Sequence, residues 1–234
     1  MLLAASLAML LVACKTKPPV TISQASATPT ATQTPTPSPT PLPPLPTPDP
    51  NLPSMAAIKA FIAKFGDPPE ATLGRFRIPR LDVDAAISKR VVGRNLALDS
   101  LNPFGPTDVT WYDFSIDPRF GGTPGGGHNA VFAAHVDYSY RVHYAGATYS
   151  GPAIFQNVGK LIPGDVIEVT MSGAPVRFSV VWQRQIHETS SEWSAIVSAS
   201  VSEGDSITLI TCTGNFDAAT QDYDSRTVIR AKRV

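Results

Sequence analysis

The sequence has little cysteine and no clusters of basic charge. Two cysteines among 234 residues, Cys14 and Cys212, could form at most one disulfide, so a fold held by several disulfides is excluded. Lys and Arg number 19, Asp and Glu also number 19, and no basic run exceeds two residues. Nucleic acid is therefore not an expected partner, because its binders carry a basic patch.

Proline is scarce over most of the chain, because 13 of the 23 prolines fall within Pro18–Pro53. This stretch has one charge, Asp49, and no aromatic residue, so it cannot bury a core. We expect residues 15–53 to form a polyproline-II-biased tether with a reach of roughly 110 Å. Removing the first 53 residues from 234 leaves 181, which suits one domain and is too few for two.

The first 14 residues are typical of an export signal. Met1–Ala13 is almost wholly apolar. It is too short to span a membrane as a helix, which needs about 20 residues. The run Leu11-Val12-Ala13-Cys14 resembles a bacterial lipobox, which implies lipid attachment at Cys14. An ordinary cleaved signal and an uncleaved signal anchor are the alternatives. All three predict an extracytoplasmic protein, and lipidation would anchor it to the cell membrane.

An amphipathic helix is predicted over residues 54–66. Ser54 is a suitable N-cap, and Gly66 ends a pattern in which Ile58, Phe61 and Phe65 share one face. We expect this apolar face to dock on the following domain rather than on membrane, since few cations flank it.

Residues 70–234 are predicted to be mostly β, in a sandwich or closed barrel with short helices. A helical turn is expected within Ala153–Leu161, and Thr213–Asp224 is interpreted as a loop between the last two strands. The expected strands are Arg75–Ile78, Val83–Val92, Asn129–His135, Val166–Met171, Val176–Gln183, Ser206–Cys212 and Arg226–Ala231.

Cys212 is a candidate nucleophile at the end of one of these strands. Alternation places Cys212 with Ser206, Thr208 and Ile210 on the more polar face. Taken alone, a lone cysteine is better explained as a small buried hydrophobe than as a nucleophile. If Cys14 is lipidated, however, Cys212 is the one free thiol of an exported protein, which favours a reactive role.

Arg226 and His135 are the expected partners of this thiol. Alternation puts Arg226 on the outer face of the final strand, where a guanidinium favours thiolate and stabilises an oxyanion. Arg230 and Arg233 are interpreted as solvated surface charges. His135 ends the predicted apolar strand Asn129–His135 and is suited to proton transfer. The other three histidines, His128, His143 and His187, are assigned surface roles.

The sequence from about Arg75 to Val234 resembles the sortases, cysteine transpeptidases of bacterial surfaces. Thr208-Leu209-Ile210-Thr211-Cys212 resembles the family's Thr-Leu-x-Thr-Cys signature, and Phe132–Asp137 resembles its histidine strand. Arg226 falls where the family carries its arginine. Matches that include Trp111-Tyr112 and His135-Val136-Asp137 are most similar to the subgroups called class E and class F.

The resemblance implies an eight-stranded barrel that uses neither cofactor nor metal. It also implies that Cys212, His135 and Arg226 are catalytic, and that Thr211, Asp137 and Trp111 line the substrate groove. The expected partners are a sorting-signal peptide of the Leu-Pro/Ala-x-Thr-Gly type and an amine acceptor of the cell wall.

The sequence departs from the family pattern in two features. The glycine-rich stretch Asp117–Gly127 is longer than the family pattern suggests, which indicates a lid or an altered groove wall. The family's usual anchor is a transmembrane helix, not a lipid.

Two alternative functions stay open. They are a metal-dependent hydrolase using His128, His135 and Asp137, and a non-catalytic, tethered peptide-binding barrel.

Overall fold

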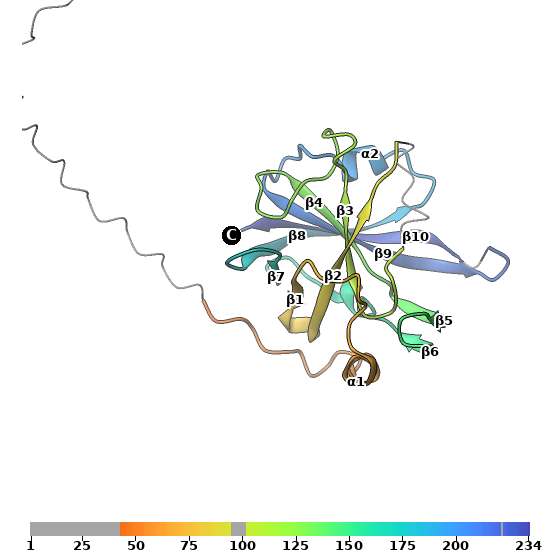
Figure 1. Cartoon of the computed structure of the whole chain (residues 1–234). Coiled ribbons are helices and arrows are strands. Elements are labelled where there is room, and N and C mark those ends of the chain that lie inside the picture. Colours follow the sequence, from red (N-terminus) through yellow and green to blue (C-terminus); the bar gives the residue numbers. More distant parts are fainter. Residues whose placement is uncertain (1–42, 95–101, 221) are drawn as a thin grey trace, which may run out of the picture. The chain divides into compact units, whose positions relative to one another are not determined.

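Eight strands close into a barrel in the computed structural model, which describes residues 43–94, 102–220 and 222–234 (Figure 1). The barrel strands are β1 (Arg75–Ile78), β2 (Val83–Val91), β3 (Val109–Asp113), β4 (Asn129–Ala133), β7 (Val166–Thr170), β8 (Val176–His187), β9 (Ser206–Asp217) and β10 (Asp222–Arg233). Their hydrogen-bonded order is β1-β2-β3-β4-β9-β10-β8-β7, and β7 pairs back with β1. This confirms the mostly-β fold class and the eight-stranded barrel.

Two of the strand pairings, β2 with β3 and β4 with β9, are parallel, and the others are antiparallel. The parallel pairing of β4 with β9 matters for the site, because the carboxyl ends of two parallel strands meet at the same rim. His135 follows β4, and Cys212 lies in the second half of β9. The topology alone therefore brings these two residues toward one end of the barrel.

The remaining elements are short. They are the helices α1 (Ala56–Phe65) and α2 (Trp193–Ile196), the 3-10 helices η1 (Pro79–Leu81) and η2 (Val158–Lys160), and a hairpin of β5 (Asp137–Val142) with β6 (Ala147–Pro152). The β3, β5 and β6 strands were missing from the sequence prediction. The Tyr-rich, polar β5 and β6 are mostly solvent-exposed and lack the apolar alternation that a buried face would impose.

The barrel interior is packed with aromatic and aliphatic side chains. Phe76, Phe132, Phe155 and Phe178 are fully buried there, and the Phe76 and Phe132 rings lie 5.1 Å apart. A second buried cluster lies on the other face of β4, β9 and β10, where Val131, Ile210 and Val228 pack with Tyr112, Phe114, Ile186 and Val197. The face that carries Cys212 is thus more apolar than alternation predicted, because α2 and the loop after β3 cover it.

The prediction for Arg230 was wrong. Its side chain is buried, with the residue only 2% exposed, and it pairs with Glu203 at 3.3 Å. Arg230 also donates to the Ile196 carbonyl at 2.9 Å. Arg230 therefore ties β10 to the α2 segment instead of facing solvent, whereas Arg233 is exposed as expected.

The prediction of a loop over Thr213–Asp224 was also wrong. β9 continues to Asp217 and β10 begins at Asp222, so the two strands form a long hairpin that projects beyond the barrel (Figure 1). Gly214, Asn215 and Asp217 are turn-forming residue types, which hid the strand in the sequence. The hairpin forms one wall above Cys212.

The helix expected at 54–66 lies at Ala56–Phe65 and docks on the domain, as its apolar face predicted. Ile58 and Phe61 are buried, and the Phe61 ring lies 5.0 Å from the Tyr149 ring of β6. The helix N-cap is Met55, without a side-chain cap hydrogen bond, and not Ser54 as predicted. Ser54 lies one residue earlier and accepts a hydrogen bond from the Ala56 amide at 3.1 Å.

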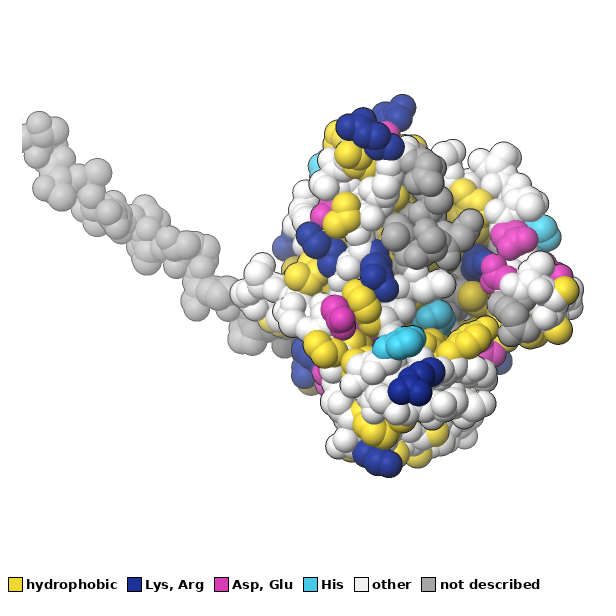
Figure 2. Space-filling model, turned by 45° about the vertical axis from the view of Figure 1, so that its right-hand side comes forward, with side chains coloured by type: hydrophobic (Ala, Val, Ile, Leu, Met, Phe, Trp, Pro, Cys, Tyr) yellow, Lys and Arg dark blue, Asp and Glu magenta, His cyan; other side chains and the backbone are white. Residues whose placement is uncertain are grey.

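The described ranges contain no helix of the length and apolarity that crossing a bilayer requires. The predicted export signal, including Cys14, lies outside the described residues. On the face that Figure 2 shows, basic and acidic side chains are interspersed, in keeping with the balanced charge of the sequence.

Candidate active site

Cys212 lies at the floor of a pocket on the outer side of the barrel. Ile207 and Leu209 of the same strand point into the interior core, whereas Ile210 belongs to the outer cluster. Alternation therefore carries Cys212 outward, where it is partly exposed and is the free cysteine of the described residues. The pocket has a volume of about 690 Å³.

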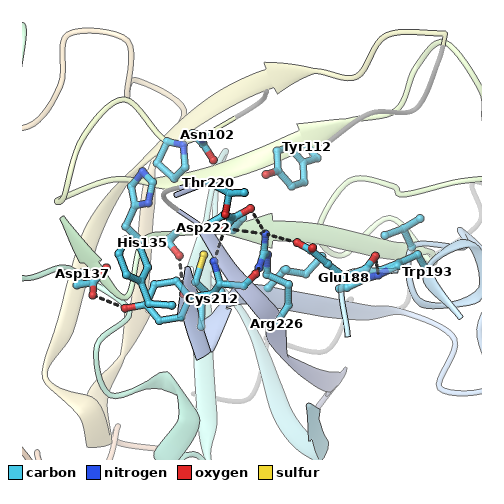
Figure 3. A pocket seen from close by; sticks show the side chains of 18 of the residues that line it. Asn102, Tyr112, His135, Asp137, Glu188, Trp193, Cys212, Thr220, Asp222 and Arg226 are labelled. Atoms are coloured by element: carbon cyan, nitrogen blue, oxygen red, sulfur yellow. Dashed lines mark hydrogen bonds and ion pairs between the residues drawn. The ribbon is translucent and has the colours of Figure 1, made fainter. Parts of the chain in front are cut away.

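Strand register places Arg226 and His135 on either side of Cys212. Arg226 of β10 is the direct partner of Cys212 in the antiparallel pairing. On the other side, Ala133 of β4 pairs with Ile210 in parallel register. Continuing both chains by two residues brings His135 level with Cys212, with neighbouring strands about 5 Å apart. All three side chains line the same pocket (Figure 3).

A side-chain hydrogen bond maintains this register beyond the end of β4. The Thr211 hydroxyl donates to the Ala134 carbonyl at 2.7 Å, in a buried position. The Phe155 amide donates to the His135 carbonyl at 3.0 Å, which fixes the backbone of the histidine from the opposite side. Thr211 thus connects the segment that carries the thiol to the segment that carries the imidazole.

Burial keeps both the thiol and the imidazole close to neutral. Burial raises the pKa of the Cys212 thiol, the Arg226 charge lowers it, and the Asp222 and Asp137 carboxylates raise it. Burial also lowers the pKa of His135 from 6.5 to about 4, although the Asp137 carboxylate acts in the opposite direction. The geometry therefore favours a resting thiol beside a neutral imidazole at neutral pH.

Arg226 is held by several acceptors at the pocket wall. Its guanidinium contacts both Asp222 carboxylate oxygens, at 2.8 and 3.0 Å, and lies 3.8 Å from a Glu188 oxygen. It also donates to the backbone carbonyls of Tyr223 and Ser225. These contacts fix the cation beside the thiol (Figure 3).

Asp137 lines the pocket and connects two of its walls. The Tyr223 hydroxyl of β10 donates to an Asp137 carboxylate oxygen of β5 at 2.6 Å. This hydrogen bond is the main cause that raises the pKa of Tyr223 to about 12. Asp137 therefore clasps the projecting hairpin to the β5–β6 hairpin, on the His135 side of the pocket (Figure 3).

Trp111, expected in the groove, lies elsewhere. Its ring belongs to the interior core cluster, and its indole N–H donates to the Gly122 carbonyl at 2.9 Å. The neighbouring Tyr112 points to the opposite face of β3 and lines the pocket instead. The two adjacent aromatic residues of a strand must face opposite sides, and here the interior takes the larger ring.

The sequence analysis missed the apolar wall of the pocket. Residues far apart in the sequence build it, namely Phe114, Phe120, Trp193, Val197 and Ile210. The glycine-rich stretch Asp117–Gly127 supplies Phe120 and is held by a bridge between Phe120 and Ser198. It therefore contributes a groove wall, one of the two roles suggested by its length. The acidic residues Glu188 and Asp222 were also missed.

The geometry gives no support to a metal site using His128, His135 and Asp137. His128 precedes β4 and His135 follows it, so the two lie roughly 20 Å apart along the chain. Across the described ranges, no three His, Cys, Asp or Glu side chains cluster as metal ligands would.

Comparison with known proteins gives one family. The profile described as Sortase domain matches residues 76–234. No curated protein matches the sequence. Among solved structures, sortase E1 from Streptomyces coelicolor with a tripeptide in its active site is similar over 72% of this chain and 91% of its own, at 21% identity and a TM-score of 0.48. Sortase C-1 from Actinomyces oris is similar over 81% and 88%, at 21% identity and a TM-score of 0.48.

Proposed function

Because the chain belongs to the sortase family of cysteine transpeptidases, we propose that it cleaves a sorting signal of the Leu-Pro/Ala-x-Thr-Gly type between Thr and Gly. The threonine acyl group is held as a thioester on Cys212 and is then transferred to an amine acceptor at the cell surface. The observation that carries this proposal is the row formed by His135, Cys212 and Arg226 across three adjacent chain segments. The roles of these three residues are part of the proposal.

In the first half-reaction, the Cys212 sulfur attacks the threonine carbonyl carbon while His135 takes the thiol proton. Arg226 stabilises the negative charge that develops on the carbonyl oxygen. The C–N bond then breaks, His135 returns the proton to the departing glycine amine, and the thioester remains. A neutral resting imidazole is suited to this order of steps, because it has a free lone pair for the thiol proton.

In the second half-reaction, the acceptor amine attacks the thioester carbonyl and gives up a proton to His135. The C–S bond breaks, and the proton returns to the sulfur as the new amide leaves. Water in place of the amine would give hydrolysis. Apart from the two substrates, the proposed steps use only the side chains of Cys212, His135 and Arg226.

The apolar wall supports a peptide ligand with an aliphatic side chain. Phe114, Phe120 and Val197 offer a surface on which a leucine side chain would be removed from water. The polar floor near Cys212 would receive the threonine end of the signal. Sortases act outside the cytoplasm; lipid anchoring through Cys14 and the tether over 15–53 belong to the proposal for this chain.

The test is incubation of the full chain with a library of Leu-x-x-Thr-Gly peptides, followed by mass spectrometry of the products and of Cys212. We expect release of the glycine-terminated fragment, an acyl adduct on Cys212, and loss of both in Cys212→Ala. Cleavage that survives Cys212→Ala and stops with a chelator would support the metal-hydrolase alternative. Tight peptide binding with no adduct would support a non-catalytic peptide-binding barrel.

A further inference from the structure

The contact between Asp222 and Arg226 joins two residues that a regular strand would separate. Both lie on β10, four residues apart, a spacing of about 13 Å along an ideal strand. Nevertheless, both Asp222 carboxylate oxygens lie within 3.0 Å of one guanidinium nitrogen. The long Arg226 side chain therefore runs back along β10 to reach the Tyr223 carbonyl and the Asp222 carboxylate.

The pairing of β9 with β10 has a register shift between Tyr223 and Ser225, next to this contact. The shift places two residues of β9, Gly214 and Asn215, opposite the single residue Asp224 of β10. The Asp224 carboxylate accepts hydrogen bonds from Asn215 at 2.9 and 3.2 Å. Gly214 faces this bulge with a positive φ of 91°, and a Cβ there would collide with the Asp224 carboxylate. The sequence thus supplies a glycine and a capping carboxylate where the strand bends.

We propose that Asp222 is the positioning residue for Arg226: it holds the guanidinium level with Cys212 so that the cation is in place when charge develops on the substrate carbonyl. This inference rests on the proposed function for the peptide reaction, but the geometric relationship among Asp222, Arg226 and Cys212 does not depend on it. The guanidinium is then already oriented when the substrate binds. The reaction therefore does not bear the entropic cost of ordering a long side chain.

Glu188 is the weaker of the two carboxylate partners. It lies 3.8 Å from the guanidinium, beyond hydrogen-bond distance. Exposure does not separate the two, since the Glu188 and Asp222 side chains are 46% and 44% exposed. Asp222, with two oxygens in contact, makes the short charge-assisted bonds that set geometry. We therefore assign the positioning role to Asp222 and treat Glu188 as a secondary contributor to the local charge.

The charged and titratable groups around the thiol determine whether the pKa of Cys212 rises or falls when Asp222 is replaced. They come from the segment after β4, from β5, from the end of β8 and from β10, and comprise His135, Asp137, Glu188, Asp222, Tyr223 and Arg226. Among the charges, Arg226 has the largest effect on the pKa of Cys212 and lowers it, whereas Asp222 raises it. If Asp222 only adds negative charge, removing it must lower the pKa of Cys212. If Asp222 also positions Arg226, its removal lets the guanidinium move away, and the pKa rises.

The experiment compares three variants of the full chain with the wild type. Asp222→Asn removes the charge, Asp222→Glu keeps it, and Asp224→Asn is the matched control, because it removes a carboxylate from the same hairpin without contacting Arg226. The first measurement is the rate of iodoacetamide alkylation against pH, followed at Cys212 by mass spectrometry. The second is the kcat and KM for cleavage of the peptide selected from the Leu-x-x-Thr-Gly library. Thermal unfolding checks that all variants are folded.

We expect Asp222→Asn to shift the alkylation profile to higher pH and to lower kcat by about tenfold to a hundredfold, with little change in KM. Asp222→Glu should retain most of the wild-type kcat, and Asp224→Asn should match the wild type in both measurements. A profile shifted to lower pH in Asp222→Asn, or a kcat that rises, would overturn the proposal and identify Asp222 as a group that blocks Arg226. Alkylation does not need the peptide, so absence of peptide cleavage in the wild type would refute the proposed function without touching this result.

Discussion

Cys212 and Arg226 are direct cross-strand partners, with Cys212 on β9 and Arg226 on β10. Side chains of such a pair emerge on the same side of a sheet, about 5 Å apart at the backbone. The guanidinium charge therefore acts on the thiol through a short path that is partly shielded from water. The pairing is set by backbone hydrogen bonds, so it does not depend on the conformation of any loop.

Replacing Arg226 with Ala should raise the pKa of Cys212, because the one charge that lowers it is lost. Peptide cleavage should fall by roughly a hundredfold to a thousandfold, the usual cost of removing a group that stabilises an oxyanion. Alkylation of Cys212 against pH and steady-state kinetics measure the two effects. Arg233→Ala, an exposed arginine at the far end of the same strand, is the control and should change neither.

Acidification should destabilise the protein through His135. Between pH 6.5 and about 4, the imidazole takes up a proton in the unfolded chain but not in the folded one, so stability falls as the pH falls. This contribution amounts to at most about 3 kcal/mol of unfolding free energy and is complete above pH 6.5. Urea unfolding of the wild type and of His135→Gln across this window measures it. Equal pH dependence in both proteins would contradict the burial of His135; exposed His187→Gln should behave like the wild type.

The hydroxyl of Tyr223 should resist ionisation because it donates to Asp137. Its pKa is raised to about 12, against an ordinary value of 10.0. The difference in phenolate absorbance between the wild type and Tyr223→Phe isolates this residue from the other tyrosines. In Asp137→Asn the pKa of Tyr223 should return toward 10.0, since both the acceptor charge and the strongest hydrogen bond are lost. Ionisation near 10.0 in the wild type would show that the clasp between the two hairpins is open in solution.

Replacing Thr211 with Val should lower the rate of peptide cleavage without changing the reactivity of the Cys212 thiol. The change keeps the shape of the side chain but leaves the Ala134 carbonyl without its donor, at a cost of about 1–3 kcal/mol. Because His135 follows Ala134, we expect kcat to fall roughly tenfold through misplacement of the imidazole. Alkylation of Cys212 should be nearly unchanged, and Thr211→Ser should restore kcat. A loss of alkylation equal to the loss of kcat would assign the effect to the thiol instead.

The sequence was most informative where a strand has one face in the interior core. Ile207 and Leu209 fix which way Cys212 points, and Arg75–Ile78 was predicted with its observed bounds. It was least informative where distant segments meet. Nothing near Phe120 or Trp193 indicates that they share a pocket wall, because their proximity arises from the loop after β3 packing beside α2.

Charge was also hard to interpret locally. Arg230 and Arg226 lie on the same face of one strand, yet the first is buried against Glu203 and the second borders the pocket. At Arg230, the α2 segment covers the strand, and its Ile196 carbonyl accepts a hydrogen bond from the guanidinium. The bulge at Gly214 and Asn215 likewise could not be inferred, since Gly followed by Asn suggests a turn as readily as a bulged strand.

Because β4 pairs directly with β9, the segments that carry the reacting groups are distinct from the hairpin that borders the ligand pocket. The imidazole and the sulfur are carried by neighbouring segments of the barrel, whereas the β5–β6 hairpin, which lies between them in the sequence, forms a separate two-stranded sheet beside the pocket. The β5–β6 hairpin could therefore be exchanged to alter which molecules are accepted, while the barrel strands hold the reacting atoms in place.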